Sequence, residues 1–235
     1  MEKQLNKYEE GQVLLIDKPL NWTSFDIVRK IRSLIKIKKV GHAGTLDPLA
    51  TGLLIVCNGK FTKKINGYMG MEKEYTGAFT LGAVTPTYDL ESEPMEITDI
   101  SNLTESDIKK AVLPFIGAIQ QTPPIHSAIK KDGKPVYLLA RKGLEVELEA
   151  RTITIKDFGI EKIELPKVYF RVVCSTGTYI RSLANDFGKQ LGCGAYLSSL
   201  RRTRIGNFLA EDALQINAFT EQIRNDVTLK RQTNT

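Results

Sequence analysis

The chain is organised around one stretch, Gly41-His42-Ala43-Gly44-Thr45-Leu46-Asp47-Pro48-Leu49-Ala50-Thr51-Gly52-Leu53-Leu54. A residue before proline is pushed away from the α conformation, so the side chain of Asp47 is expected to project from a bend. Pro48 then starts a short helical turn that Gly52 closes, and residues 53–57 read as a buried strand. Taken locally, the same pattern is also typical of an ordinary helix cap and a glycine-rich bend.

Composition limits the classes of protein that remain. The 235 residues are 42% hydrophobic with a formal charge of +6 and a pI of about 9.1, which favours a polyanionic partner. No apolar run approaches the ~18 residues of a membrane span, and the charged start predicts no signal peptide. With three cysteines, no CxxC pair and two histidines, we expect no metal, no disulfide and a cytoplasmic location.

The segment before the central stretch predicts a strand and then a helix. Residues 12–16 form an apolar strand, and Thr23 with Asp26 makes a capping-box-like helix start. The apolar residues of this helix recur at helical spacing: Ile27, Val28, Ile31, Leu34 and Ile35. Cations lie between or after them with no acid among them: Arg29, Lys30, Arg32, Lys36, Lys38 and Lys39. This pattern fits a solvated helix face and phosphate binding about equally well.

Further elements follow from periodicity and from turn residues. We predict strands at residues 73–82, 151–155 and 168–174, a polar loop at 91–103, and helices at 104–113, 135–143 and 179–191. Gly192 is expected to close the last of these helices as its C′ residue. Two further basic regions are Lys130, Lys131, Lys134, Arg141 and Lys142, and the closely spaced Arg201, Arg202 and Arg204.

The fourteen residues of the central stretch, in order, resemble the nucleophile loop of TruB-family pseudouridine synthases, the bacterial tRNA pseudouridine-55 synthases. Other segments resemble further motifs of the family and extend the similarity over about residues 10–215: 18–24, with Asn21 where glycine is common, 73–82, 120–130, 178–183 and 196–206. Asn tolerates the left-handed backbone, so the turn at Asn21 can survive. His126 is interpreted as a loop or packing residue.

The resemblance implies a set of site residues. It implies catalytic roles for Asp47, Arg181 and Tyr179, and substrate-binding roles for His42, Tyr75, Leu200 and Lys18. By this similarity Tyr75 is the stacking platform for a flipped base, and Arg181 is the cation that holds Asp47 ionised. Tyr179 would transfer a proton at C5 or orient Arg181 and the base. His42 would fill space beside the extruded base, and Leu200 would line the pocket.

The implied reaction is the isomerisation of uridine to pseudouridine in the T-loop of tRNA. Asp47 could attack C1′ or C6, or remove a proton from C2′, and the sequence leaves these routes open. No cofactor is expected, because the reaction has no net redox change or hydrolysis. The alternatives are an RNA-binding or tRNA-folding module and a related ribosomal RNA synthase with guide partners; a hydrolase is disfavoured because the loop holds no second acid.

For the fold, we predict the α+β class. The expected architecture is a mixed, mostly antiparallel sheet flanked by helices, with a central RNA-binding cleft; the pseudouridine-synthase topology comes from the resemblance. We expect a catalytic domain at residues 1–210 and a short helical tail at 211–235, without a complete RNA-binding domain of the PUA type. The catalytic domain would then grip tRNA through its basic regions, as a monomer.

Overall fold

The computed structural model describes residues 8, 10–125, 127, 130–131, 134–135 and 148–233. The chain divides into two compact units. Unit 1 combines Met1–Tyr75 with Arg201–Thr235, and unit 2 is Thr76–Leu200. Two strands contribute residues to both units, β4 (Lys73–Leu81) and β10 (Ala195–Ile205).

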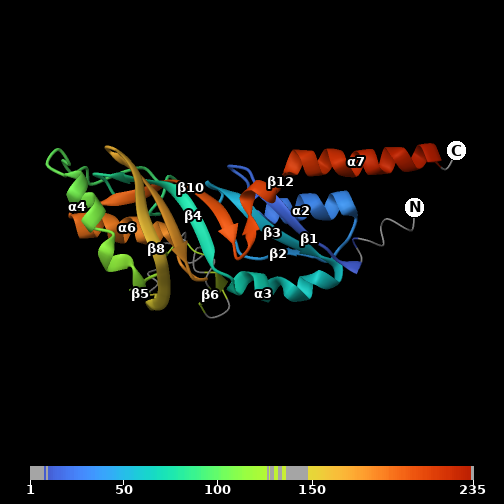
Figure 1. The fold of residues 1–235 in the computed structure, drawn as a ribbon, viewed down its shortest axis with the longest axis horizontal. Helices are drawn as coiled ribbons and strands as arrows, with labels where there is room; N and C mark the ends of the chain where they lie inside the picture. Colours follow the sequence, from blue (N-terminus) through green and yellow to red (C-terminus); the bar gives the residue numbers. More distant parts are fainter. Residues whose placement is uncertain are drawn as a thin grey trace. The chain divides into compact units, whose positions relative to one another are not determined.

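Unit 1 is built on the strand order β12-β1-β3-β10, with β2 paired to β3 and β11 to β10 (Figure 1). Its strands are β1 (Val13–Lys18), β2 (Val40–His42), β3 (Ala50–Asn58), β11 (Phe208–Leu209) and β12 (Leu214–Gln215). Its helices are α2 (Ser24–Ile35), α3 (Ile65–Gly70) and α7 (Ile216–Thr233), with 3-10 turns η1 (Gly59–Lys64) and η3 (Ala210–Asp212). β1 runs antiparallel to β3 and parallel to β12.

Alternation along β3 separates two hydrophobic clusters in unit 1. Leu54 and Val56 join a cluster with residues of α2 and α7, and Leu53, Ile55 and Cys57 join another that η1 and α3 cover. Successive residues of a strand point to opposite faces, so β3 is buried on both sides. The predicted buried strand at residues 53–57 is confirmed.

Helix α2 begins where the sequence predicts. The Thr23 side chain accepts a hydrogen bond from the Asp26 backbone N–H, and the Asp26 carboxylate accepts one from the Thr23 N–H, which completes a capping box. Asn21 adopts φ of 63°, the left-handed conformation that asparagine tolerates.

Unit 2 has the strand order β10-β4-β9-β8-β5. Its further elements are β5 (Gly117–Gln121), β8 (Arg151–Glu164), β9 (Lys167–Cys174), the two-stranded pair β6 (Lys130–Lys131) and β7 (Lys134–Pro135), α4 (Glu105–Lys110), η2 (Leu113–Phe115) and α6 (Ile180–Leu191). β8 pairs antiparallel with both β5 and β9. Together with unit 1, these mixed, mostly antiparallel strands and flanking helices confirm the α+β prediction.

An aromatic cluster fills the core of unit 2. The Phe79 and Phe170 rings stack with centroids 4.1 Å apart, and Phe158 and Phe187 pack around them. Because Phe187 belongs to α6, this cluster attaches α6 to the sheet. Gly192 ends the helix at φ of 72°, as predicted.

The helical turn predicted between Pro48 and Gly52 is wrong. Pro48 and Leu49 form a turn closed by the Ala50 N–H donating to the Asp47 carbonyl at 3.0 Å, and β3 begins at Ala50. Gly52 is a strand residue opposite Lys18 in the β1–β3 ladder. Long-range pairing outweighs the local helix signal here, because it satisfies more backbone groups than one helical turn would.

Other boundaries differ from the predictions. The helix expected at residues 104–113 ends at Lys110, with Pro114 inside η2, and the strand expected at 151–155 continues to Glu164. The C-terminal segment, where a short helical tail was expected at residues 211–235, contains the 18-residue helix α7. Of the helix predicted at residues 135–143, Pro135 lies in β7 and the rest falls outside the described residues, as does His126.

Candidate active site

The bend that carries Asp47 is fixed by backbone hydrogen bonds on both sides of the carboxylate. The Ser24 hydroxyl accepts from the Leu46 N–H at 2.8 Å and donates to the Leu46 carbonyl at 3.2 Å. The Asn21 N–H donates to the Pro48 carbonyl at 2.9 Å. The start of α2 thus holds the residues before and after Asp47, which is itself half-buried.

Lys18 lies beneath this bend. Its side chain is 0% exposed, and its ammonium donates to the carbonyls of Pro19, Trp22 and Pro48 at 3.0, 2.6 and 3.4 Å. Burial lowers the pKa of Lys18 to about 8, while the nearby Asp47 charge opposes that shift. The Lys18 ammonium therefore stabilises the loop through these hydrogen bonds and attracts the Asp47 carboxylate.

Arg202 holds the same loop from a second direction. Its guanidinium donates to the carbonyls of Leu53 at 2.8 Å, Gly44 at 3.1 Å and Thr45 at 3.4 Å, and the residue is 1% exposed. These contacts use all three nitrogens of the planar guanidinium, Nε, Nη1 and Nη2. The single ammonium of a lysine cannot reproduce this geometry. Arg202 connects the loop before Asp47 to the strand that follows it.

His42 ends β2 at the start of the same loop. It is half-buried, and its pKa is lowered chiefly by burial and further by the Arg202 charge, with the Gly44 backbone acting in the opposite direction. The imidazole is therefore neutral at pH 7.

The start of α6 organises Arg181 and Tyr179 within unit 2. The Gln121 side-chain amide clamps the Tyr179 backbone, donating to its carbonyl at 3.1 Å and accepting from its N–H at 2.8 Å. Arg181 is 5% exposed; its Nε lies 3.6 Å from an Asp89 carboxylate oxygen, and it donates to the Thr87 carbonyl at 3.3 Å. A buried arginine at a helix N-terminus is unfavourable without an anion, and Asp89 supplies one within this unit.

The remaining predicted substrate residues lie on the central strands. Tyr75 is buried in β4, and Leu200 is half-buried in β10. The predicted pairing of Arg181 with Asp47 would join residues of different units and stays a prediction. The same holds for the central cleft and for the roles given to Tyr75, Tyr179 and Leu200.

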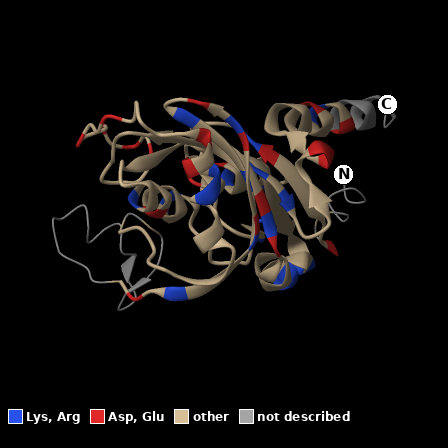
Figure 2. Ribbon diagram, turned by 60° about the vertical axis from the view of Figure 1, so that its left-hand side comes forward, with Lys and Arg blue, Asp and Glu red and all other residues tan. Residues whose placement is uncertain are grey.

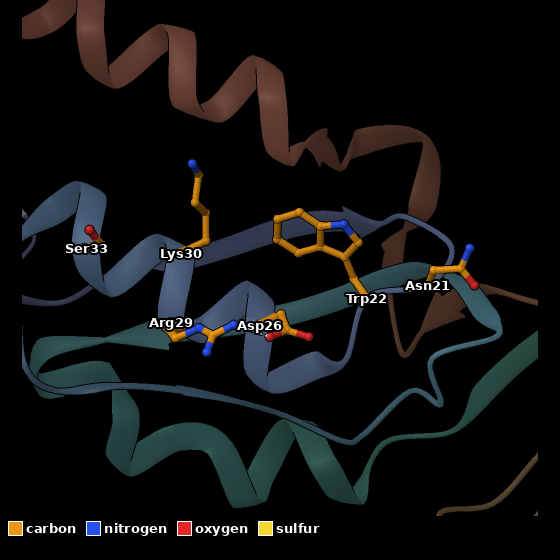
Figure 3. A pocket seen from close by; sticks show the side chains of 6 residues that line it. All are labelled: Asn21, Trp22, Asp26, Arg29, Lys30 and Ser33. Carbon is orange, nitrogen blue, oxygen red and sulfur yellow. Dashed lines mark hydrogen bonds and ion pairs between the residues drawn. The ribbon is translucent and has the colours of Figure 1, made fainter.

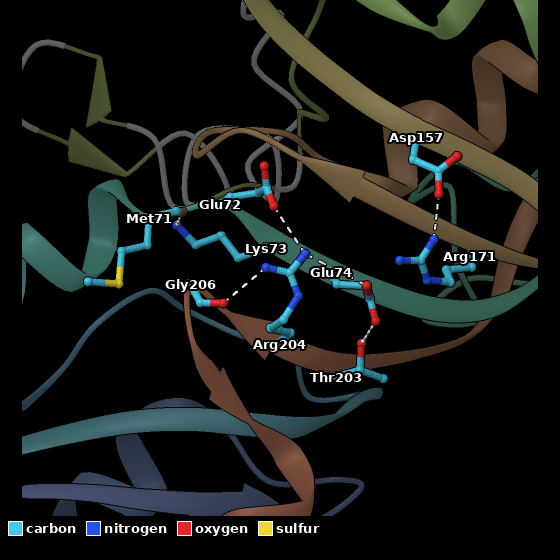
Figure 4. Close-up of polar contacts among 9 residues, drawn as sticks. All are labelled: Met71, Glu72, Lys73, Glu74, Asp157, Arg171, Thr203, Arg204 and Gly206. Carbon is cyan, nitrogen blue, oxygen red and sulfur yellow. Dashed lines mark hydrogen bonds and ion pairs between the residues drawn. The ribbon is translucent and has the colours of Figure 1, made fainter.

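The basic region at residues 201–204 has internal partners in unit 1. Arg201 forms a two-pronged ion pair with Asp17, both contacts at 2.9 Å. Arg204 contacts Glu72 at 3.0 Å, Glu74 at 3.7 Å and the Gly206 carbonyl at 2.9 Å (Figure 4). Arg202 is bound to the loop, so all three arginines of this region have partners within unit 1.

Sequence reasoning missed the individual roles of Arg202, Gln121 and Asp89. The signal that could have found Arg202 was a strand at residues 195–205, which was not predicted: adjacent residues of a strand point to opposite faces, which separates Arg201 from Arg202. Nothing local in the sequence singles out Gln121, whose partner Tyr179 lies 58 residues away.

Two features of the described part of the chain bear on its chemistry and setting. Among those residues, no three His, Cys, Asp or Glu side chains gather where they could hold a metal ion. None of the helices described is both long and apolar enough to cross a membrane.

Comparison with known proteins assigns the family. The N-terminal domain of the TruB family pseudouridylate synthases matches residues 32–180, and the tRNA pseudouridylate synthase B C-terminal domain matches residues 181–232. The chain belongs to the TruB family of pseudouridine synthases.

Individual relatives agree with this assignment. The chain is 53% identical to tRNA pseudouridine synthase B of Flavobacterium johnsoniae over 93% of this chain and 98% of that protein. It is 49% identical to the protein of the same name from Phocaeicola vulgatus, over 91% and 94% of the two chains.

A solved structure described as a Cbf5-Nop10-Gar1 complex contains a similar fold. The TM-score is 0.73 at 30% identity, over 94% of this chain and 56% of that chain. This chain therefore spans a little over half the length of that structural relative.

Proposed function

We propose that this protein is the tRNA pseudouridine-55 synthase of its cell, converting one uridine in the T-loop of tRNA to pseudouridine with Asp47 as the catalytic carboxylate. The names of the curated relatives support the tRNA substrate. The observation that carries the catalytic assignment is the construction of the loop. Lys18, Arg202 and Ser24 form hydrogen bonds with the backbone around Asp47, and Asp47 itself is half-buried.

The reaction breaks the N1–C1′ bond of uridine and forms a C5–C1′ bond. The C5 proton leaves to solvent, and N1 gains a proton, so atoms and electrons balance without a redox partner. Asp47 acts at C1′, at C6 or on the C2′ proton; each route needs its ionised form. The nearby Lys18 ammonium attracts the Asp47 carboxylate, and the Asp47 charge in turn raises the pKa of Lys18 against the effect of burial.

The target base must leave the RNA stack before Asp47 can reach its sugar. Extrusion costs a few kcal/mol and is offset by stacking on an aromatic side chain, the role we assign to Tyr75. His42 and Leu200 complete the pocket. Arg181 pairs with the Asp47 carboxylate, and Tyr179 transfers the proton at C5 or orients Arg181 and the base. We assign Lys18 to positioning rather than direct contact, because its buried ammonium faces backbone carbonyls.

We further propose that the protein acts as a monomer in the cytoplasm. Its three cysteines, Cys57, Cys174 and Cys193, are buried, and buried thiols are compatible with a reducing compartment. Contact with RNA would come from cations on and after α2, including Lys36, Lys38 and Lys39.

The decisive experiment measures tritium release from tRNA transcripts labelled at uridine C5. The wild-type protein should release one tritium per tRNA, and transcripts lacking the T-loop should release none. Asp47→Asn is nearly isosteric, so folding and tRNA binding should persist while turnover disappears. Pseudouridine above trace level in the Asp47→Asn reaction would remove Asp47 from its role, and equal release from transcripts without a T-loop would remove the assigned target.

A further inference from the structure

A concave site lies on unit 1 beside α2. It has a volume of about 360 Å³ and is lined by Asn21, Trp22, Asp26, Arg29, Lys30 and Ser33 (Figure 3). This volume lies within the range of about 300–1,000 Å³ typical of small-molecule sites. The indole of Trp22 lies at one side of the pocket and the extended Lys30 side chain at another, and none of the residues assigned to catalysis lines it.

The charges of the pocket favour an anion. Its one acidic lining residue, Asp26, is occupied by the Thr23 N–H and hydroxyl at 3.0 and 2.6 Å and by Arg29 at 2.6 Å. Those contacts hold the pKa of Asp26 low, chiefly through Thr23, so its charge is matched locally. Lys30 then gives the pocket a net positive charge, and more cations follow along the chain at Lys36, Lys38 and Lys39.

Trp22 adds an aromatic surface to this cationic site. Its side chain is half-buried against the cluster that α2 forms with β1, β3 and α7, so the ring is held in place while part of it stays accessible. Aromatic side chains combined with cations are the usual means of binding unpaired nucleotides, because the base stacks on the ring and the phosphate meets the cation.

The pocket is also connected to the catalytic loop. The Asn21 N–H donates to the Pro48 carbonyl, and the Lys18 ammonium bridges the carbonyls of Trp22 and Pro48. Two residues that line the pocket therefore share hydrogen bonds with the residue that follows Asp47. A ligand seated on Trp22 would contact the segment that positions the catalytic carboxylate.

We propose that this pocket is a second RNA subsite, which binds one unpaired nucleotide of the substrate by stacking its base on Trp22 and pairing its phosphate with Lys30. The proposal rests on the proposed function in taking RNA as the ligand. It concerns a nucleotide other than the uridine that Asp47 acts on. An acidic peptide would satisfy Lys30 but would leave the Trp22 ring without a planar partner, so RNA is the better match.

The sequence provides a direct probe, because Trp22 is the only tryptophan of the chain. We would titrate the full-length protein with a five-residue oligoadenylate, which contains no uridine and so cannot be isomerised. Stacking of adenine on Trp22 should quench the intrinsic fluorescence saturably. Lys30→Gln should weaken the binding about fivefold near 0.1 M salt and reduce the slope of log K against log[salt] by about 0.7, the value for one phosphate contact.

Lys109→Gln is the matched control, since it removes the same charge from an exposed helix outside the pocket and outside the basic regions. It should change the affinity less than twofold. Trp22→Leu and Trp22→Phe, assayed with a fluorophore-labelled oligoadenylate, separate stacking from packing. Trp22→Leu should weaken the binding of the oligoadenylate at least about fivefold. Trp22→Phe, which keeps an aromatic face, should retain most of the wild-type affinity.

The outcomes distinguish this subsite from the proposed function. Asp47→Asn should show normal quenching although it has lost turnover. Quenching without any tritium release from tRNA by the wild-type protein would uphold the subsite and overturn the proposed reaction. Normal tritium release combined with no quenching, or with quenching that Lys30→Gln leaves unchanged, would overturn the subsite alone.

Discussion

Arg201 and Arg202 are neighbours in the sequence with opposite environments. The Arg201 side chain is 40% exposed and pairs with a carboxylate, whereas Arg202 is 1% exposed and binds only backbone carbonyls among its described contacts. An exposed ion pair is worth little, because water competes for both charges. A buried hydrogen-bond donor is costly to remove, because its acceptors are left unsatisfied.

The two arginines therefore make a matched pair of substitutions. Arg202→Met should lower the free energy of unfolding by about 3 kcal/mol or more, since three buried carbonyls lose their donor. Arg201→Met should cost about 1 kcal/mol or less. Urea denaturation followed by circular dichroism measures both, and equal losses in the two variants would contradict the assigned difference in burial.

Lys18 should make stability depend on pH. Its pKa is lowered in the folded protein from 10.5 to about 8, mainly by burial, with Arg202 adding to this and Asp47 and Asp26 opposing it. Between these two values the unfolded chain holds more protons than the folded one, so the free energy of unfolding rises with pH there. Below about pH 8 Lys18 is protonated in the folded and the unfolded protein, so the full free-energy cost of burying its charge lowers the stability.

Comparison with Lys18→Met isolates this effect from that of other titrating groups. The wild-type free energy of unfolding minus that of Lys18→Met should increase from pH 8 to pH 10 and be flat below pH 7. Urea denaturation at each pH measures the difference. A difference that stays constant from pH 7 to pH 10 would show that the Lys18 ammonium is not buried as described.

At the scale of elements, Gly52 lets β3 lie close to β10. Gly44 and Gly52 both have φ of 100°, but a Cβ at Gly52 would lie 2.3 Å from the Arg202 carbonyl oxygen, whereas one at Gly44 would meet only a guanidinium nitrogen at 3.7 Å. Strain from positive φ is therefore common to both positions, and collision with a backbone is specific to Gly52.

Alanine substitution should separate these two costs. Gly44→Ala should destabilise the protein by about 1–3 kcal/mol through backbone strain. Gly52→Ala should cost more, because β3 and β10 must also move apart. Thermal and urea denaturation compare the two variants. A Gly52→Ala protein as stable as Gly44→Ala would exclude the close approach of the two strands.

Features marked by local capping residues and local periodicity were the most predictable. The capping box at Thr23 and Asp26, the left-handed Asn21 and Gly192, and the periodic apolar faces depend on residues a few positions apart. The turn at Pro48 was mispredicted for the opposite reason. Its conformation is set by pairing of β3 with β1 and by contacts from Arg202, about 150 residues away.

For the whole molecule, the formal charge of +6 predicts that the affinity for RNA depends on salt concentration. Figure 2 shows basic and acidic residues interspersed along the ribbon, and the Arg201 and Arg204 charges are matched internally. Affinity for a T-arm RNA should fall with salt by about 0.7 log units per tenfold increase for each phosphate contact. Filter binding at several salt concentrations measures the slope, and a slope near zero would refute an electrostatic grip.

The sequence by itself determined the family, the α+β class and the segment that carries Asp47, because these depend on ordered motifs and local periodicity. Only the tertiary structure decided how the ends of the chain combine into unit 1, and which cations bind partners inside that unit. It placed Lys18 and Arg202 under the loop and gave Arg201 and Arg204 carboxylate partners. The physical reason is that a charged side chain has the same local signature whether it meets water, a carboxylate or a buried carbonyl, and only long-range packing selects among them.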